Sequence, residues 1–295
     1  MVKFRKITDS LCICQKCILK QIFGVVKIKN FIVLKFEMDW YINRTRHVHS
    51  KQARKHMVYT GATHFSEIGA GREARVVRYG NRAIRIPHNA KKHYNQAISH
   101  MKPHPNVVQI LAVEDKSGII EMKYIHGKSL AKMLDTGPAR PVHAVQFMLQ
   151  ILNGVAHLHN NHIVHGDLSS HNIIVYRGGL KIIDFYAERP LHGSPIYMAP
   201  EVVRFDRASA QGDIWSTAIL MLMLEGLAPW SDFELPHLIF HLGSNPTALH
   251  GPPEAGASAL FADVVRLIFQ ESGDRASLAT VRRSIQDLAL LYIIS

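Results

Sequence analysis

Short apolar runs separated by turn-forming residues dominate residues 65–124. Gly, Asn or Pro stands between one run and the next, a pattern typical of β-strands. The sequence therefore predicts a small antiparallel sheet with strands at residues 65–69, 74–79, 82–86, 107–113 and 118–124. One weakly helical stretch, residues 91–101, lies between the third and fourth strands.

The pattern changes to a helical one after His126-Gly127. Apolar residues recur every third or fourth position over residues 142–160, which predicts an amphipathic helix. Two short strands at 173–176 and 180–183 flank a predicted Gly178-Gly179 turn, and a Pro/Gly-rich loop covers 246–253. Further helices are predicted at residues 213–224, 259–270 and 278–293. The fold class is therefore α+β, with a small β-sheet lobe at about 61–125 and a larger, mainly α-helical lobe at about 126–295.

Residues 1–60 are basic and show no clean periodicity, so we interpret them as an N-terminal extension. Residues 1–100 hold 20 basic and 5 acidic side chains, whereas the remainder holds 15 and 18, and the net charge is +12. Such asymmetry is typical of a segment that contacts nucleic acid or an anionic membrane. A merely solvated basic segment explains it equally well.

Composition narrows the class of protein further. With 47% hydrophobic and 20% charged residues the chain can bury a sizeable core, which excludes disorder over most of its length. Cys12, Cys14 and Cys17 are the only cysteines, so no disulfide network staples the rest of the chain, and three thiols without a fourth ligand are expected to be reduced and metal-free. This favours an intracellular protein of the cytoplasm or nucleus. No run of 18 residues is both apolar and uncharged, so we expect no transmembrane or targeting segment.

Five short motifs follow one another along the two lobes. They are a glycine-rich loop at 68–76, the run Ala-Ile-Arg at 83–85, His-Gly-Asp-Leu at 165–168 with Asn172, Asp-Phe-Tyr at 184–186 and Ala-Pro-Glu at 199–201. This series resembles the eukaryotic protein-kinase family over about residues 65–290. The resemblance implies a bilobal protein-kinase fold with a ligand cleft between the lobes.

The resemblance also implies the chemistry: ATP- and Mg²⁺-dependent transfer of the γ-phosphoryl group to protein substrates. Asp167 would orient or deprotonate the acceptor hydroxyl, and Asn172 and Asp184 would bind Mg²⁺. Residues 193–201 are similar to the substrate-binding loop of Ser/Thr kinases, so the acceptor would be serine or threonine. Ser169 stands where these kinases usually have a lysine, which weakens phosphate stabilisation.

The ATP site implied by the resemblance lies mainly in the small lobe, with the backbone of residues 123–125 meeting the base. Arg85 stands in the place of the strand lysine and would contact phosphate as a catalytic residue. The ATP-binding residues are Ile68, Gly69, Gly71, Ala74, Val76, Ala83, Arg85, Met122 and Ile174.

Two further residues resemble elements that shape the large lobe, and a third departs from the family pattern. Asp213 is similar to the aspartate that braces the catalytic loop, and Arg275 to the partner of the Ala-Pro-Glu glutamate, here Glu201. Gly166 replaces the arginine that commonly grips an activation-loop phosphate, so we expect no loop-phosphorylation switch.

The small lobe departs from the family pattern at its central ion pair. Arg85 is not equivalent to lysine, because its planar fork differs from a compact ammonium. No Asp or Glu occurs between Ala74 and Val113, so the helix glutamate that should hold this cation is missing.

Three interpretations remain open. In the first, Arg85 is held by Asn95 or Gln96 and a slow kinase survives. In the second, the chain is a pseudokinase that serves as a binding or scaffolding module. In the third, the basic extension contacts nucleic acid or membrane and the kinase-like fold is secondary. Retention of all three polar residues of the large-lobe site favours catalysis.

Overall fold

The computed structural model describes residues 65–294 apart from gaps at 72–73, 89–95, 115–116 and 186–193. The predicted extension at 1–60, its boundary with the kinase-like domain near residue 61 and the cysteines lie outside the described residues.

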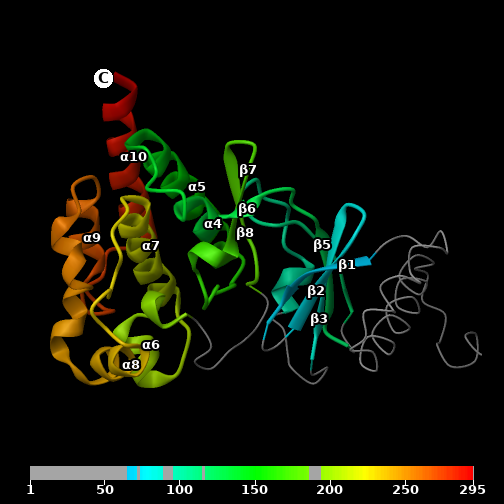
Figure 1. Cartoon of the computed structure of the whole chain (residues 1–295), viewed down its shortest axis with the longest axis horizontal. Helices are drawn as coiled ribbons and strands as arrows, with labels where there is room; N and C mark the ends of the chain where they lie inside the picture. Colours follow the sequence, from blue (N-terminus) through cyan, green and yellow to red (C-terminus); the bar gives the residue numbers. More distant parts are fainter. Residues whose placement is uncertain (1–64, 72–73, 89–95, 115–116, 186–193, 295) are drawn as a thin grey trace, which may run out of the picture. The chain divides into compact units, whose positions relative to one another are not determined.

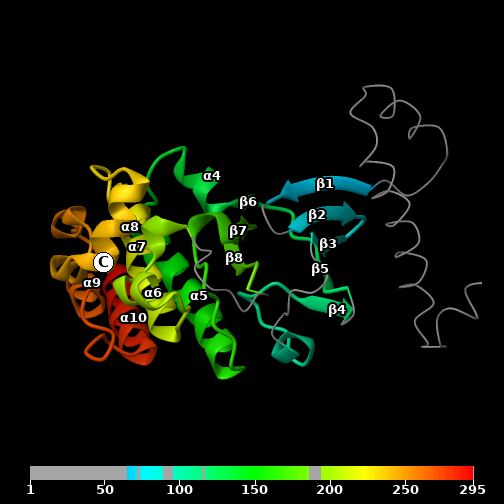
Figure 2. The same ribbon diagram turned by 90° about the horizontal axis from the view of Figure 1, so that it is seen from below.

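A five-stranded antiparallel sheet forms the small lobe (Figure 1), which confirms the predicted sheet. The strands lie in the order β1-β2-β3-β5-β4, and β2 and β3 are joined by a tight turn at Gly80-Asn81 in which Gly80 has a φ of 57°. Figure 2 shows the same strands from below. Their bounds are β1 Phe65–Ala70, β2 Ala74–Tyr79, β3 Arg82–Pro87, β4 Ile110–Glu114 and β5 Ile119–Lys123.

The fourth strand begins three residues later than predicted. The N–H of Val108 donates to the carbonyl of Ile182 (2.9 Å), and the N–H of Ile182 donates to the carbonyl of Asn106 (2.8 Å). Residues 106–108 therefore bond strand β8 of the large lobe (Gly179–Ile182), and β4 begins only after them, at Ile110. The predicted strand is thus divided, because its first residues pair with β8 and its later residues form β4.

The predicted helix at 91–101 is shorter in the part that the structure describes. Residues 91–95 lie outside it, and a single 3₁₀ turn, η2, covers Gln96–Ser99. Ile98 in this turn is buried.

A second, three-stranded sheet opens the large lobe, with β6 at Lys128–Ser129 and β7 at Ile173–Tyr176 beside β8. The β7–β8 turn consists of Arg177 and Gly178, both with positive φ, as a two-residue type I′ hairpin requires. The predicted Gly178-Gly179 turn is therefore wrong by one residue, because Gly179 already pairs with Tyr176.

Helices make up the rest of the large lobe. Pro141 stands in the first turn of α5, where the missing N–H costs nothing, and the Ser209 hydroxyl caps α7 by accepting from the N–H of Gly212 (2.9 Å). The bounds are α4 Leu130–Leu134, α5 Pro141–Asn160, α6 Pro200–Phe205, α7 Ala210–Leu224, α8 Leu235–Ser244, α9 Ala262–Ile268 and α10 Leu278–Ile294. The 3₁₀ turns are η3 Ser170–Asn172, η4 Pro195–Tyr197, η5 Pro246–His250 and η6 Pro253–Ala257.

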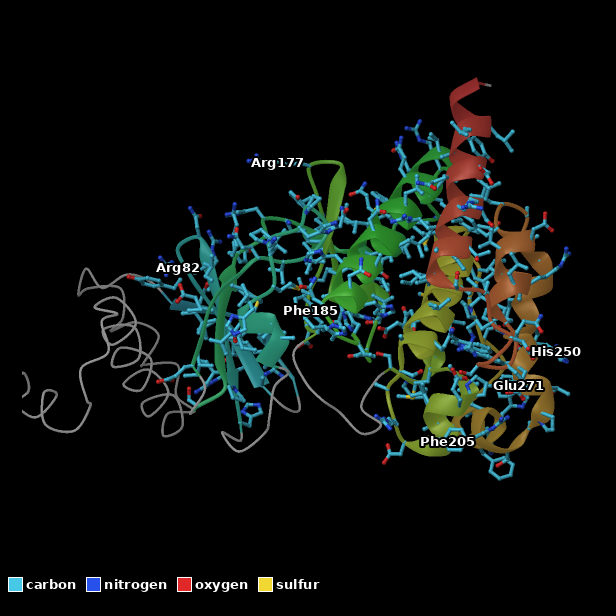
Figure 3. The ribbon with its side chains drawn as sticks, turned by 180° about the vertical axis from the view of Figure 1, so that it is seen from behind. Arg82, Arg177, Phe185, Phe205, His250 and Glu271 are labelled. Atoms are coloured by element: carbon cyan, nitrogen blue, oxygen red, sulfur yellow. The ribbon has the colours of Figure 1, made fainter. Side chains whose placement is uncertain are left out.

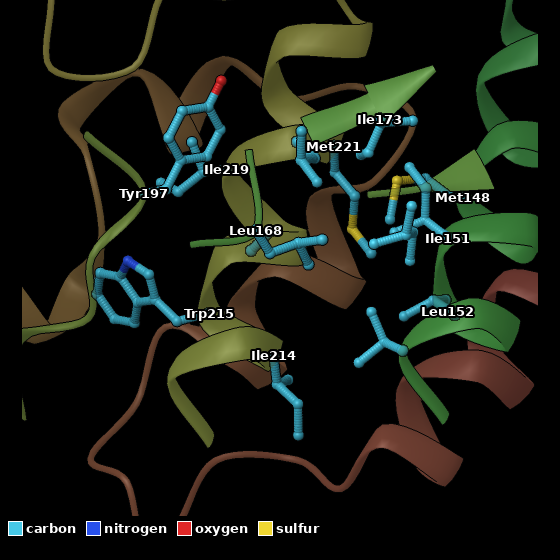
Figure 4. Close-up of a cluster of buried hydrophobic side chains, with 14 of the residues drawn as sticks. Met148, Ile151, Leu152, Leu168, Ile173, Tyr197, Ile214, Trp215, Ile219 and Met221 are labelled. Atoms are coloured by element: carbon cyan, nitrogen blue, oxygen red, sulfur yellow. The ribbon is translucent and has the colours of Figure 1, made fainter. Parts of the chain in front are cut away.

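The core of the large lobe surrounds α7, which packs against α5 on one side and α9 on another. Figure 4 shows Met148, Ile151 and Leu152 of α5 close to Met221 of α7, with Leu168 of the catalytic loop beside them. The predicted helices on α5, α7, α9 and α10 are confirmed, although α9 is shorter than predicted at both ends. The helices α4, α6 and α8 were not predicted, since each is too short to show a sustained helical period.

None of the helices within the described ranges is both long and apolar enough to cross a membrane.

Candidate active site

Asp213, at the start of α7, holds the catalytic loop from below. Its carboxylate accepts hydrogen bonds from the N–H of His165 (2.8 Å), the N–H of Gly166 (2.9 Å) and Nε2 of His159 (2.8 Å). The residue is 2% exposed. The structure thus shows the bracing role of Asp213 that the resemblance implies. His159 also contacts the Asp213 carboxylate, although the sequence analysis did not identify it.

Asp167 and Asn172 meet across one turn of the loop. Nδ2 of Asn172 donates to the backbone carbonyl of Asp167 (2.8 Å) and to its Oδ2 (3.1 Å), while Oδ1 of Asp167 accepts from the N–H of Ser194 (3.1 Å). The carboxylate is therefore fixed from two sides. The Ser194 amide was not singled out in the sequence, because a backbone donor leaves no residue-type signal.

Asp184 joins this pair through its neighbour in the chain. The N–H of Ile183 donates to the carbonyl of Asn172 (2.9 Å), which places the residue before Asp184 directly against the catalytic loop. Asp184 has a φ of 61°, a left-handed conformation that Asp tolerates better than most residues.

Phe185, which is labelled in Figure 3, follows β8 by three residues and is 1% exposed. Its ring lies edge-on to that of His165, with 6.4 Å between the centroids. His165 in turn donates from Nε2 to the carbonyl of Ile183 (3.0 Å), and its Nδ1 accepts from the N–H of Asp167 (3.2 Å). One imidazole therefore connects the segment before Asp184 to the catalytic loop.

The donor set fits magnesium. Because Nδ2 of Asn172 faces Asp167, the side-chain oxygen Oδ1 is the atom left for a cation, and Asp184 adds carboxylate oxygens. Few, hard oxygen ligands supplemented by phosphates and water are what Mg²⁺ uses in phosphoryl-transfer sites. No cluster of three or more His, Cys, Asp or Glu residues suited to another metal occurs among the described residues.

Arg85 is buried on β3, and its Nε lies 3.4 Å from Oδ1 of Asp184. The support from Asn95 or Gln96 stays a prediction, because Asn95 and the side chain of Gln96 lie outside the described part. An acidic partner comes from the large lobe, 99 residues away in sequence.

One face of the small-lobe sheet gathers the predicted nucleotide residues. Val76 lies opposite Arg85 and Ala83 lies opposite Met122, and directly opposed residues in an antiparallel pair point to the same face. Gly69 lies opposite Val76 on the next strand. The structure thus brings together residues that the resemblance assigned separately.

The glycine loop is held at its tip. The N–H of Gly71 donates to the carbonyl of Ala74 (2.9 Å), and Nε2 of His88 lies 3.1 Å from the carbonyl of Gly71. His88 carries no motif that could have marked it in the sequence. Ile68 is largely exposed beside an irregular register in β1.

The segment between the lobes presents its backbone selectively. The N–H of Lys123 donates to Gln109 and that of Tyr124 to Asn81, whereas within the described ranges the N–H of Ile125 donates to no other backbone group. Of residues 123–125, Ile125 is therefore the donor best able to meet a base. Ile174 lies close to Gly127, two residues after this segment, because a Cβ added at Gly127 would come within 2.8 Å of Cγ2 of Ile174.

The substrate-loop residues pack against the catalytic loop. The Tyr197 hydroxyl lies 2.8 Å from Oγ of Ser170 and accepts from the Ser170 N–H (3.2 Å). Burial raises the pKa of Tyr197 above its ordinary value, so the phenol stays protonated. Ser169, at the position where the family usually has a lysine, is 1% exposed.

Glu201 and Arg275 form a bidentate ion pair, with Nη1–Oε1 at 2.5 Å and Nη2–Oε2 at 3.1 Å. The Arg275 side chain is fully buried and also donates from Nε to the carbonyl of Ile268. The pairing implied by the resemblance is confirmed.

Known proteins are similar in sequence to about half of this chain. The chain is 33% identical over 162 aligned residues to the serine/threonine-protein kinase STE11 of Saccharomyces cerevisiae. The alignment covers 49% of this chain and 23% of that protein. Mitogen-activated protein kinase kinase kinase 2 of Arabidopsis thaliana is 34% identical over 50% of this chain and 25% of its own length. The serine/threonine-protein kinase PrkC of Bacillus subtilis is 34% identical over 43% and 22%. The matched part thus amounts to about a quarter or less of each relative.

The family described as "Protein kinase domain" matches residues 66–242, from the first strand of the small lobe to α8. This is more than half of the chain, and it includes the glycine loop, Arg85, the catalytic loop and Asp184. The chain belongs to the protein kinase family.

Proposed function

We propose that the chain transfers the γ-phosphoryl group of ATP, with Mg²⁺, to serine or threonine residues of protein substrates. The observation that carries this proposal is the meeting of two segments, the catalytic loop with Asp167 and Asn172 and the segment that leads into Asp184. Asp167 and Asn172 are in hydrogen-bond contact (3.1 Å), and the residue before Asp184 bonds Asn172 (2.9 Å). A fold alone does not require these residue types together.

Asp167 acts on the acceptor. Its two carboxylate oxygens are fixed by Ser194 and Asn172, so the group can orient a substrate hydroxyl without rearranging. A hollow opens beside it between the catalytic loop, residues 194–199 and the start of α7. A carboxylate held in this way serves as the base that accepts the hydroxyl proton.

Asn172 and Asp184 would hold the metal, and Arg85 would contact the phosphates from the sheet. Bound there, Mg²⁺ would supply positive charge against the negative charge of the phosphates during transfer. The sheet face with Val76, Ala83 and Met122 covers the base, and Gly69 and Gly71 let the loop approach the phosphates.

The names of the relatives support serine and threonine as acceptors, since two of those described above are named serine/threonine-protein kinases. The alternative of a catalytically silent binding module finds no support in these comparisons. We place the enzyme inside the cell, where ATP and Mg²⁺ are available.

Transfer of labelled phosphate from ATP to generic protein acceptors tests the proposal. We expect Asp167→Asn and Asp184→Asn each to lower incorporation about 10²- to 10⁴-fold, since each removes a group that acts in the transition state. Asp263→Asn is the matched control, because its carboxylate is 94% exposed and pairs with Arg266 on the same helix, α9. Phosphoamino acid analysis should find label on serine or threonine.

Equal incorporation by the parent chain and both site variants would overturn the proposal. Label on tyrosine would leave kinase activity in place but contradict the assigned acceptor.

A further inference from the structure

The position of Arg85 is unusual for a guanidinium. The residue is 8% exposed, and on β3 it lies between Val76 and Ile120 of the flanking strands. A buried positive charge needs an acidic partner, because leaving it unpaired in the interior is strongly unfavourable. The requirement is met by Asp184.

This pairing uses a residue that also belongs to the metal site. No Asp or Glu occurs from Ala74 to Val113, so no neighbouring helix of the small lobe can supply the counter-charge. Asp184 is the carboxylate whose oxygens, with Oδ1 of Asn172, form the magnesium donor set. The two demands on Asp184 compete.

Electrostatics decide which demand is met first. A divalent cation that approaches Asp184 meets a carboxylate already neutralised by a cation 3.4 Å away, and it is repelled by that same guanidinium. Phosphate groups change the balance, because they offer Arg85 alternative acceptors in the bidentate geometry that guanidinium groups prefer.

We propose that Arg85 guards the metal site: in the ligand-free protein it keeps free divalent cations from Asp184, and the cation enters only together with the nucleotide. The inference rests on the proposed function in that it takes Asp184 as the metal ligand. It goes further in assigning to Arg85 control over the order of binding.

Binding of Mn²⁺, followed by the electron paramagnetic resonance signal of the free ion, tests this directly. In the absence of nucleotide we expect the parent chain to bind Mn²⁺ more weakly than Arg85→Gln, with a dissociation constant at least about tenfold higher. With a non-hydrolysable ATP analogue present, the parent chain should bind Mn²⁺ tightly.

Arg82→Gln is the matched control. This substitution removes a positive charge from the same strand, β3. Arg82 pairs with Glu121, and because it lies three residues before Arg85 its side chain points to the opposite face of the sheet. It should bind Mn²⁺ like the parent. Equal Mn²⁺ affinity of the parent and Arg85→Gln without nucleotide would overturn the inference.

Thermal unfolding of the parent chain provides a second measurement should Arg85→Gln fail to fold. We expect Mn²⁺ alone to leave the melting temperature unchanged and Mn²⁺ together with the ATP analogue to raise it. Stabilisation by Mn²⁺ alone would contradict the guarding role. Neither readout needs turnover, so a loss of phosphotransfer, which would defeat the proposed function, is recorded separately.

Discussion

The catalytic loop and strand β3 solve the same problem in different ways. Both place charged groups inside the protein, but the loop satisfies Asp213 and Asp167 within the large lobe, through short contacts to backbone amides and nearby side chains. Strand β3 satisfies Arg85 with a carboxylate from the other lobe. The contacts that hold the catalytic loop therefore come from the large lobe, whereas the charge of Arg85 is balanced by a contact between the two lobes.

The largest effect should come from removing the brace of the loop. Asp213→Ala leaves the N–H groups of His165 and Gly166 without their acceptor in a buried site, so we expect a loss of about 4 kcal/mol in the free energy of unfolding. Urea denaturation measures it. Asp263→Ala, at an exposed ion pair, should change stability by less than about 0.5 kcal/mol. A similar small change for Asp213→Ala would show that the loop is not held from below.

The ion pair of Glu201 and Arg275 tests whether the rest of the large lobe is equally self-sufficient. Glu201→Ala leaves a fully buried guanidinium without its carboxylate, and we expect about 3 kcal/mol of destabilisation. Adding Arg275→Met removes the stranded charge and should recover part of the loss. Additive effects of the two substitutions, measured in a double-mutant cycle, would contradict a direct coupling.

Gly166 tests how rigid the loop backbone is. Its φ is 72°, and a Cβ added there would lie 3.0 Å from Cβ of Ala208. Gly166→Ala should therefore cost about 1–2 kcal/mol from the left-handed backbone, plus a smaller amount from the contact. Gly80→Ala isolates the first part, because Gly80 has a φ of 57° and nothing within 4 Å of an added Cβ. Equal costs at the two sites would show that Ala208 yields freely.

The smallest effect concerns the pH dependence of stability that arises from His104, in the segment before β4. Burial, then His157 and Lys181, hold the pKa of His104 below its ordinary value of 6.5, and Nδ1 of His104 accepts from the N–H of Asn106 (3.1 Å). Below about pH 6.5 the unfolded chain takes up this proton before the folded chain does, so stability should fall as the pH decreases. Above about pH 6.5 the imidazole is largely neutral in both states, so the full stability is retained there and is lost only as the pH falls.

His104→Asn preserves an acceptor for the Asn106 N–H but cannot titrate. The melting temperature of this variant should fall less than that of the parent between pH 7 and pH 5.5. Parallel curves would show that His104 does not contribute to the acid sensitivity.

Local sequence signals were sufficient where structure depends on near neighbours. Short apolar runs bounded by turn-forming residues predicted β2 and β3 correctly, and a helical period over 142–160 predicted α5. The family resemblance supplied Asp167 and Asn172, whose spacing of five residues closes one turn of the loop.

Signals failed where a residue answers to a distant partner. Residues 107–109 look like strand, yet 106–108 bond β8. Arg85 meets Asp184 across 99 positions, a pairing that no local pattern records. A ring nitrogen of His88 contacts the carbonyl of Gly71, 17 residues earlier in the chain. Nothing about a glycine and a histidine at that spacing predicts the contact.

Helix α7 has consequences for how the large lobe assembles. From Gly212 to Leu222 every residue is buried, so this helix has no face that water could stabilise. It cannot persist as an isolated helix, and α5 and the catalytic loop rest on it. The lobe therefore forms or unravels as one cooperative unit, and a fragment that stops before residue 210 would lack the scaffold around which the other helices condense.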